Sequence, residues 1–419
     1  MNSFFWIEAS CAAICLVCLV CFLLLALFLN KEKRRFVLPH TENSTRFAVL
    51  IPARNESAVI GASLSSLHRS DYPTDLYDTY VIVESMEDPT VKICEEFPNT
   101  HVFLRRDLTK RAKGYALDEC MKDIFANGPH YDAFLIMDAD NLVAKDFLSR
   151  MNDAYRAGYD AACGKRNNKD WNASAVSSSS ALTFTIINLL QNKPKTARGM
   201  NVMVSGTGFF VRADVLRELG GWPFSTLTED YEFSNYAMCN DLRTCYVDDA
   251  VYYDEQPLTL WQSIIQRSRW VRGYFTVWAK YRKIKKAYRK THRKNKNMCA
   301  MCFGTVPLFA LAFDYILYLL AVITFTVICA VQHSTLLCGF LIRLGACLGT
   351  LYLGLALLGA LLLYMDRKAV DMRPINKIKT VLFHPIFLIS YVVAAVRALF
   401  IGNKWEVIRH TMGEERTDL

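Results

Sequence analysis

Apolar residues are concentrated in two regions of this chain, with a region of ordinary composition between them. Hydrophobic residues make up 52% of the 419 positions, and the excess lies within residues 9–29 and beyond residue 303. The first segment, Ser10–Asn30, carries no charge, and it holds about 20 apolar residues, enough to cross a ~30 Å hydrocarbon core. We therefore expect a membrane protein with a large aqueous domain inserted between its spans.

The charges after the first apolar segment predict its orientation. In a signal peptide the basic residues come before the apolar run, whereas here a basic cluster follows the run and no small-residue cleavage site precedes that cluster. By the positive-inside tendency, the cluster from Lys31 to Arg35 places the following chain in the cytoplasm. We expect residues 1–30 to be an anchor in the plasma (inner) membrane and the inserted domain to be cytoplasmic.

Further spans are expected in the last third of the chain. They are Phe303–Val331 and Thr335–Met365, followed by the basic loop Asp366–Lys379. A last apolar segment, Thr380–Ile401, contains a proline and two ionisable residues, so it either crosses the bilayer or lies re-entrant. A dense basic run at 282–296 ends just before the first of these spans, so we expect its partner to be anionic lipid headgroups and not nucleic acid.

From residue 46, short apolar strands alternate with helices. Strands are expected at 47–52, 78–85, 101–105 and 132–140, and helices at 57–68, from residue 89, and at 113–125. Such alternation is typical of a parallel sheet in a doubly wound α/β domain, and ligands of these domains bind at the carboxyl ends of the strands. Polar clusters follow three of the expected strands: Arg54-Asn55-Glu56, Glu84-Ser85 and Asp138-Ala139-Asp140.

The last of these clusters is a candidate metal site. Asp138 and Asp140 stand at alternate residues where a strand ends, so both carboxylates can turn toward one point. Carboxylate oxygens and a phosphate-bearing substrate together suit Mg²⁺ or Mn²⁺. A solvated turn is the alternative, but the position of the pair favours metal and nucleotide binding.

A glycine-rich segment and an acid pair follow at 205–234. Gly206 and Gly208 permit close approach of the backbone to a ligand. Glu229 and Asp230 precede an amphipathic run that we expect to be a helix. Acids favour the first turn of a helix, so simple capping is the alternative. Capping needs only one acid, however, and it does not explain the glycines.

Aromatic and basic residues are interspersed over residues 255–283, a composition typical of helices that lie on a membrane surface. Within this segment, Arg269 suits a diphosphate leaving group and Trp270 suits stacking on a sugar ring. A plain interfacial anchor would explain the aromatic residues equally well. It explains the ordered run QRSRW at 266–270 less well.

Together these motifs resemble those of the processive family-2 inverting glycosyltransferases, which include cellulose, hyaluronan, chitin and poly-N-acetylglucosamine synthases. The resemblance extends from residue 46 to about residue 280, and each motif alone is weak evidence. The markers, in chain order, are IPARNE at 51–56, the acidic strand end at Glu84, KRAKGYAL around Lys113, Asp-x-Asp at 138–140, GTG at 206–208, TED at 228–230 and QRSRW at 266–270.

The resemblance implies a GT-A fold, which is a Rossmann-like α/β domain, acting on a UDP-sugar with Mg²⁺ or Mn²⁺. It implies that the donor is contacted by Arg54, Glu56, Glu84, Lys113, Asp138 and Arg269, and that the metal is bound by Asp140 and Asp138. It implies catalysis by Asp230 as general base, with Glu229 beside it. The acceptor or pyrophosphate contacts that it implies come from Gly206, Gly208, Gln266, Arg267 and Trp270. Position 84 departs from the family, because many members have Asp there.

The resemblance also implies a domain organisation and a reaction. We expect an anchor at 1–30, the GT-A domain at 46–255, amphipathic interface helices and a basic juxtamembrane segment at 256–300, two or three spans at 303–402, and a tail at 403–419. One displacement with inversion would extend, and export, a β-linked polysaccharide. The alternative is transfer of a single sugar to a membrane lipid. A non-catalytic receptor of the same fold is disfavoured, because every acid that the chemistry needs is present.

Four ionisable residues lie within or near the expected spans. They are Asp314, Arg343, His384 and Arg397. Such residues usually face a protein interior or a polar path. They are therefore expected either to line a conduit for a nascent chain or to pair between helices.

Overall fold

The computed structural model describes residues 36–292, 324, 327, 331 and 336–402. The expected anchor at 1–30, most of the expected span Phe303–Val331 and the tail at 403–419 lie outside the described residues. Asp314 also lies outside them.

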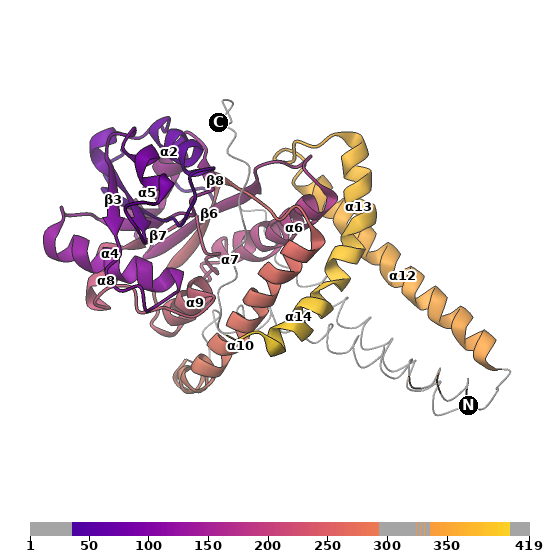
Figure 1. Ribbon diagram of the computed structural model, residues 1–419. Coiled ribbons are helices and arrows are strands. Elements are labelled where there is room, and N and C mark those ends of the chain that lie inside the picture. Colours follow the sequence, from indigo (N-terminus) through magenta and orange to yellow (C-terminus); the bar gives the residue numbers. More distant parts are fainter. Residues whose placement is uncertain (1–35, 293–323, 325–326, 328–330, 332–335, 403–419) are drawn as a thin grey trace.

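An eight-stranded sheet forms the centre of the described structure (Figure 1). Its strands lie in the order β3-β2-β1-β4-β7-β6-β8-β5. Their bounds are β1 Phe47–Pro52, β2 Tyr77–Val83, β3 Thr100–Leu104, β4 Ala133–Ile136, β5 Leu142–Val143, β6 Ala161–Asn168, β7 Phe209–Arg212 and β8 Thr244–Asp254.

The two halves of this sheet differ in strand direction. In the first half, β1 pairs in parallel with both β2 and β4, and β2 pairs in parallel with β3. This half has the parallel, doubly wound pattern that the sequence predicts. In the second half, β7 is antiparallel to β4 and β6, β6 is parallel to β8, and β5 is antiparallel to β8. The second half was not predicted in this form.

Helices cover both faces of the sheet. Successive strand residues point to opposite faces, so Phe47, Val49 and Ile51 of β1 belong to one core and Ala48 and Leu50 to the other. The first core includes residues of α2, α3 and α5, and the second includes residues of α4, α8 and α9. The bounds are α2 Ile60–His68, η1 Thr74–Leu76, α3 Pro89–Cys94, α4 Lys113–Asn127, α5 Phe147–Arg156, α6 Ala175–Thr185, the π-helix η2 Ile186–Asn192, α7 Lys193–Thr196, α8 Ala213–Glu218 and α9 Glu229–Cys239.

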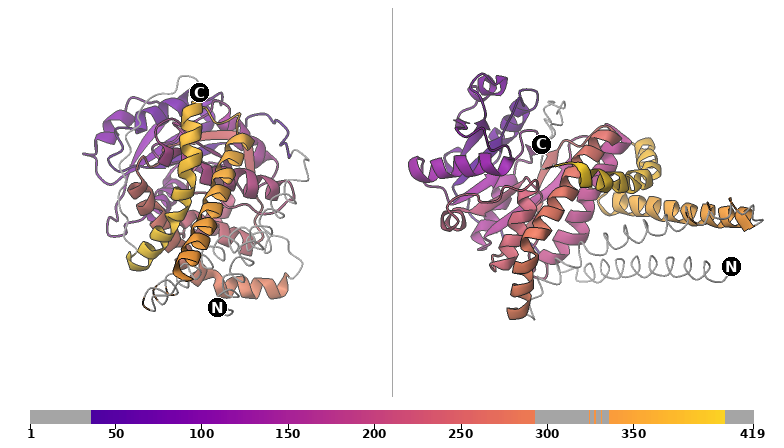
Figure 2. Two further views of the ribbon diagram at one scale, coloured as in Figure 1. Left: turned by 90° about the vertical axis from the view of Figure 1, so that its right-hand side faces the viewer. Right: turned by 60° about the horizontal axis from the view of Figure 1, so that its bottom comes forward.

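Four further helices lie outside the sheet domain. They are α10 Leu260–Thr291, α12 Leu336–Met365, α13 Pro374–Ile389 and α14 Tyr391–Phe400. α10 is a single helix of 32 residues that begins at a capping box formed by Thr259 and Gln262. Figures 1 and 2 show α10 and α14 side by side, with α12 projecting away from the sheet domain.

The apolar C-terminal segments follow the expected bounds only in part. α12 coincides with the expected span Thr335–Met365, but the expected loop Asp366–Lys379 is shorter, because α13 begins at Pro374. The expected segment Thr380–Ile401 is broken into two helices at Ser390. Among the described residues, one stretch, Pro374–Phe400, is long and apolar enough to cross a bilayer, which is weak evidence for a span.

Buried polar contacts fix the outer helices to the sheet domain. The Lys165 ammonium at β6 lies 2.6 Å from the Asp366 carboxylate, and the Asn167 side-chain amide donates to the Ala369 carbonyl at 3.1 Å. The segment between α12 and α13 is therefore held against the end of β6. β6 thus connects the sheet domain to the outer helices.

Candidate active site

The carboxyl ends of β1, β2 and β3 bring a carboxylate and two guanidinium groups together. Glu84 Oε2 lies 3.2 Å from Arg54 Nε, and Glu84 Oε1 accepts from Arg105 Nη1 at 3.1 Å. Only 4% of the Arg105 side chain is exposed, and its other Nη donates to the carbonyls of Asp107 and Lys110. The structure therefore brings the predicted Arg54 and Glu84 together and adds Arg105, which the sequence analysis did not identify.

The loop after β1 is shaped by hydrogen bonds to α3. Asn55 adopts φ 56°, and its backbone N–H donates to Asp88 Oδ2 at 2.8 Å. The Glu56 N–H donates to Thr90 Oγ1 at 3.0 Å. Asp88 and Thr90 thereby fix the backbone at Asn55 and Glu56, directly after Arg54.

Lys113 links two of the predicted motifs. At the start of α4, its ammonium forms an ion pair with Asp138 and donates to the Gly206 carbonyl at 2.8 Å. Burial would lower the pKa of Lys113, but the carboxylates of Asp138 and Glu229 outweigh it and the pKa is raised. Lys113 is thus a buried, charged ammonium that joins the Asp-x-Asp loop to the GTG loop.

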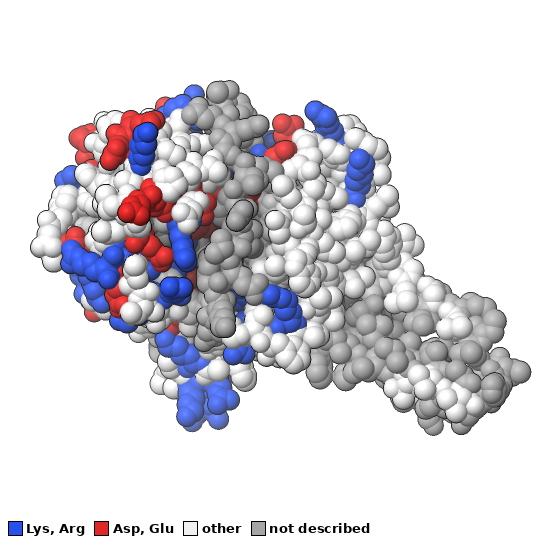
Figure 3. Space-filling model, viewed as in Figure 1, with Lys and Arg blue, Asp and Glu red and all other residues white. Residues whose placement is uncertain are grey.

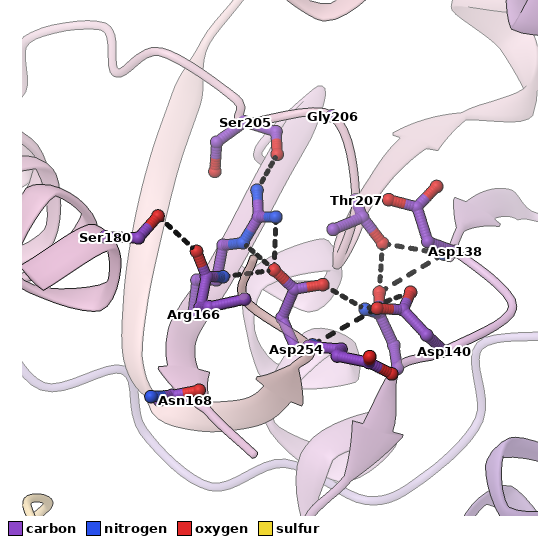
Figure 4. A network of polar contacts seen from close by, with 12 residues as sticks. Asp138, Asp140, Arg166, Asn168, Ser180, Ser205, Gly206, Thr207 and Asp254 are labelled. Atoms are coloured by element: carbon purple, nitrogen blue, oxygen red, sulfur yellow. Dashed lines mark hydrogen bonds and ion pairs between the residues drawn. The ribbon is translucent and has the colours of Figure 1, made fainter. Parts of the chain in front are cut away.

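The Asp-x-Asp loop is held by a network of side chains (Figure 4). The Asp138 N–H donates to Thr207 Oγ1 at 2.8 Å, and Thr207 donates to Asn141 Oδ1. Asp140 Oδ2 accepts from the Glu255 N–H at 3.1 Å. Both aspartates therefore have their backbone or carboxylate positioned by groups from other loops.

An ion pair supports this network from the mixed half of the sheet. Asp254, at the end of β8, accepts from Arg166 Nε at 2.8 Å and from Asn141 Nδ2 at 3.0 Å. The Arg166 guanidinium also donates to the Ser205 carbonyl at 3.2 Å and lies 3.9 Å from the centre of the Phe184 ring. Burial raises the pKa of Asp254 to about 7, against the opposing charge of Arg166. The sequence analysis did not identify these residues.

The acid pair occupies the first turn of α9. Burial and the charge of Asp230 raise the pKa of Glu229 to about 8, while Lys113 opposes the rise. Burial also raises the pKa of Asp230. Gly206 lies beside this carboxylate, since a Cβ built on it would be 3.5 Å from Asp230 Oδ2, and its φ of +78° is a backbone conformation that favours glycine.

The structure separates the residues of QRSRW. Trp270 packs edge-on against Phe184 with ring centres 5.8 Å apart, which connects it to the Arg166 network. Arg269 is 9% exposed, and the side-chain oxygen of Gln266 has no hydrogen-bond partner among the described residues.

Arg267 differs from its predicted role as an acceptor or pyrophosphate contact. It is fully buried, and its guanidinium donates to the Phe387 carbonyl at 3.0 Å and to Ser390 Oγ at 2.8 Å. These donors fix α10 to the junction between α13 and α14. We therefore assign Arg267 to helix packing and leave it out of the substrate-binding set.

The carboxylates fit a metal site that the substrate completes. Among the described residues, no group of three or more His, Cys, Asp or Glu side chains could hold a metal ion alone. Mg²⁺ commonly uses one or two protein carboxylates together with substrate phosphates and water. Asp138 and Asp140 supply such a pair, and the Asp138 side chain is 37% exposed toward solvent.

Residues 45–273, which are more than half of the chain, match the family described as "Glycosyltransferase like family 2". The chain belongs to this family. It is 28% identical over 245 residues to "Probable glycosyltransferase YdaM" of Bacillus subtilis (strain 168), covering 54% of this chain and 55% of that protein. It is 25% identical over 262 residues to "Beta-monoglucosyldiacylglycerol synthase" of Trichormus variabilis, covering 58% and 53%. The chain thus matches about half the length of these curated relatives.

A solved structure has the same fold. The mannosyltransferase PcManGT from Pyrobaculum calidifontis, in complex with GDP-Man and Mn²⁺, superposes with a TM-score of 0.61 at 17% identity, covering 93% of this chain and 99% of that one. The predicted α/β GT-A fold and membership of a family-2 glycosyltransferase family are confirmed. The synthase subtype and the site assignments stay predictions.

Proposed function

We propose that this glycosyltransferase transfers one sugar from a nucleotide-sugar to a lipid in the membrane. The observation that carries the proposal is the position of the acid pair next to α10, because Gly273 of α10 packs directly against Thr228, the residue before Glu229. α10 in turn packs through Arg267 on α13 and α14. Those two helices expose apolar side chains, which are Ile375, Ile378, Leu382, Ile386, Ile389, Val393, Val396, Leu399 and Phe400. A lipid headgroup at this apolar surface would reach the acids.

The relatives support the same acceptor class. The cyanobacterial proteins that match this chain are named as monoglucosyldiacylglycerol synthases, which form glycolipids. These names favour the lipid acceptor over the polymer that the sequence favours. Extension and export of a β-linked polysaccharide is kept as the second candidate, because QRSRW lies on α10 beside the site.

We propose a nucleoside-diphosphate sugar as the donor, held where β1, β2 and β4 end. Arg54 and Glu84 would contact the nucleoside, with Glu56 beside them, and Lys113 and Arg269 would contact the diphosphate. A fold neighbour in complex with GDP-Man and Mn²⁺ supports this donor class and a divalent metal. Asp138 and Asp140 would hold Mg²⁺ or Mn²⁺, which when bound offsets the negative charge on the leaving diphosphate.

The acid pair would provide general base catalysis. Asp230 would take the proton from an acceptor hydroxyl, whose oxygen attacks the anomeric carbon while the bond to the nucleoside diphosphate breaks. Such a base contributes roughly 10²–10⁴-fold to the rate. Glu229, with its raised pKa, would hold a proton at neutral pH and leave the negative charge of the pair on Asp230. One displacement inverts the anomeric configuration.

The membrane arrangement is also part of the proposal. The chain would be anchored in the plasma (inner) membrane by residues 1–30 and by the region 303–402, with the 46–255 domain in the cytoplasm and 256–300 at the interface. The helical stretch Pro374–Phe400 supports part of this arrangement. The tail at 403–419 would stay with the cytoplasmic domain if the last segment does not cross.

The test is incubation of the full chain in vesicles with a panel of UDP- and GDP-sugars, Mg²⁺ or Mn²⁺, and diacylglycerol. Nucleoside diphosphate release and a product that migrates as a monoglycosyl lipid are expected. A product of polymer length would replace the proposed acceptor with a growing glycan. Absence of turnover with every donor would overturn both candidates.

A further inference from the structure

Helix α10 contacts the first turns of α9 at three places. Gly273 leaves no room for a Cβ against Thr228, and the Tyr274 ring stacks on Tyr231 with centres 4.2 Å apart. Further along, the Lys280 ammonium forms an ion pair with Glu232, which is fully buried. A movement of α10 along or away from α9 would therefore move the helix turn that carries the acid pair.

The same helix also reaches the network behind the Asp-x-Asp loop. Trp270 packs on Phe184, and the Phe184 ring lies beneath the Arg166 guanidinium that binds Asp254. α10 thus contacts both the helix turn that carries Glu229 and Asp230 and the residues that hold the Asp-x-Asp loop. The position of α10 therefore bears on both parts of the candidate site.

The outward face of α10 has a distinct composition. Phe275 and Trp278 are 46% and 53% exposed. Basic residues then occupy the same side of the helix toward its C-terminal end and are exposed: Arg282, Lys283, Lys286 and Lys290. None of these four forms an ion pair within the part of the chain that the structure describes. Figure 3 shows Lys and Arg gathered at this end of the molecule. We call these six residues the outward face of α10.

The composition of this face fits an anionic lipid surface. Lysine and arginine near an anionic leaflet gain about 1 kcal/mol each, a roughly fivefold increase in binding, and aromatic rings favour the headgroup level. A nucleic acid or an acidic protein would match the charges alone. α14, which lies beside α10, also exposes apolar side chains, and these favour lipid over the other two.

We propose that the outward face of α10 docks on anionic lipid and that this contact controls turnover. The docked lipid would hold α10 in the position in which it fixes both the acid pair and the Asp-x-Asp loop. The control of turnover rests on the proposed function, whereas the docking on lipid does not. A lipid surface that binds one arrangement of α10 more tightly than others shifts the population toward it, and couplings of this kind change activity by roughly 5–150-fold. Anionic lipid is therefore an activator in addition to any acceptor.

The test compares the full chain reconstituted in phosphatidylcholine vesicles with and without phosphatidylglycerol. Two readouts are taken: release of nucleoside diphosphate from the donor that gives turnover, and trypsin cleavage within α10. With phosphatidylglycerol we expect turnover to rise on the order of 10-fold and cleavage after Lys283 and Lys286 to be slowed. Equal turnover and equal cleavage in the two vesicles would overturn the proposal.

Variants separate docking from its coupling to the site. Replacing Lys283, Lys286 and Lys290 by Gln should abolish most of the activation without changing turnover in phosphatidylcholine. A matched control replaces three exposed basic residues of the sheet domain by Gln, namely Lys92, Lys145 and Arg156, and should keep the activation. Equal loss in the control would reduce the effect to net charge and overturn the assignment to α10.

A second variant tests the connection to α9. Lys280→Gln combined with Glu232→Gln removes the ion pair without leaving a lone buried carboxylate. Trypsin protection by phosphatidylglycerol should persist in this double variant, whereas activation should fall. Activation retained at the level of the unmodified chain would overturn the coupling. If no donor gives turnover, the protection experiment still tests docking, so failure of the proposed function and failure of this inference are distinguishable.

Discussion

The two halves of the sheet support the candidate site in different ways. At the end of the parallel half, Glu84 is 28% exposed and is paired with Arg54, whose side chain is 51% exposed. At the end of the mixed half, the Arg166–Asp254 pair is 11% and 3% exposed and is surrounded by further hydrogen bonds. Exposed charges can rearrange around a ligand at little cost, whereas a buried pair must stay intact. We therefore propose that the exposed Arg54–Glu84 pair of the parallel half supplies adaptable ligand contacts and that the mixed half supplies rigid support.

The largest effect should come from the proposed base, Asp230, on which the charges of Lys113 and Arg166 act. Asp230→Asn should lower the turnover rate by about 10²–10⁴-fold, because the base is lost while the shape is kept. Affinity for the nucleoside diphosphate, measured by calorimetry, should stay within a few-fold of the unmodified chain. Undiminished turnover would remove Asp230 as the base and leave Glu229 as the remaining acid of the pair.

Glu229 should make the free energy of unfolding depend on pH, by several kcal/mol. The pKa of its carboxyl group rises from 4.5 to about 8 on folding, through burial and then the charge of Asp230. A carboxyl group with a raised pKa contributes stability below its unfolded pKa, and that stability is lost as the pH rises toward 8. Glu229→Gln should therefore raise the melting temperature relative to the unmodified chain near pH 8 and much less near pH 5. Glu218→Gln, at an exposed position of α8, should show no such dependence. A pH-independent difference would contradict the assignment.

Breaking the buried Arg166–Asp254 pair of the mixed half should have nearly as large an effect on stability. Arg166→Met should reduce the free energy of unfolding by about 3–5 kcal/mol, because it leaves Asp254 buried without its cation. Adding Asp254→Asn should restore much of the loss, since the lone charge is removed. Denaturant unfolding in detergent measures both. If the single and double variants are equally stable, the pair does not act as a unit.

These differences also explain what the sequence could predict. Strands of the parallel half are short apolar runs with polar residues directly after them, so both the strands and Glu84 or Asp138 could be identified locally. Arg166 and Asp254 also stand at strand ends, but β6 and β8 were not predicted, and the two residues are 88 positions apart. Lys165 finds its partner Asp366 across 201 positions. For Arg267 the local motif was misleading. It predicted a ligand contact, whereas in the fold the side chain binds Phe387 and Ser390.

A smaller effect should follow from Gly208, which lies directly before β7 and packs against the ring of Tyr252 in β8. Gly208 has φ +63°, and a Cβ there would overlap the ring of Tyr252. Gly208→Ala should therefore cost about 1–3 kcal/mol for overpacking, in addition to the strain of the left-handed conformation. Gly199→Ala is the matched control, because Gly199 has φ +64° with nothing within 4 Å. Equal melting temperatures for the two variants would mean that the Gly208 contact relaxes freely.

The smallest stability effect is expected at the exposed pair of the parallel half. Arg54→Met should change the free energy of unfolding by less than about 1 kcal/mol, because solvent screens its contact with Glu84 and Arg105 still binds that carboxylate. The donor KM should nevertheless rise, since we propose that Arg54 contacts the nucleoside. Denaturant unfolding and donor kinetics on one preparation separate the two effects. A loss of stability as large as that of Arg166→Met would show that both halves are rigid supports, and the functional division between them would have to be abandoned.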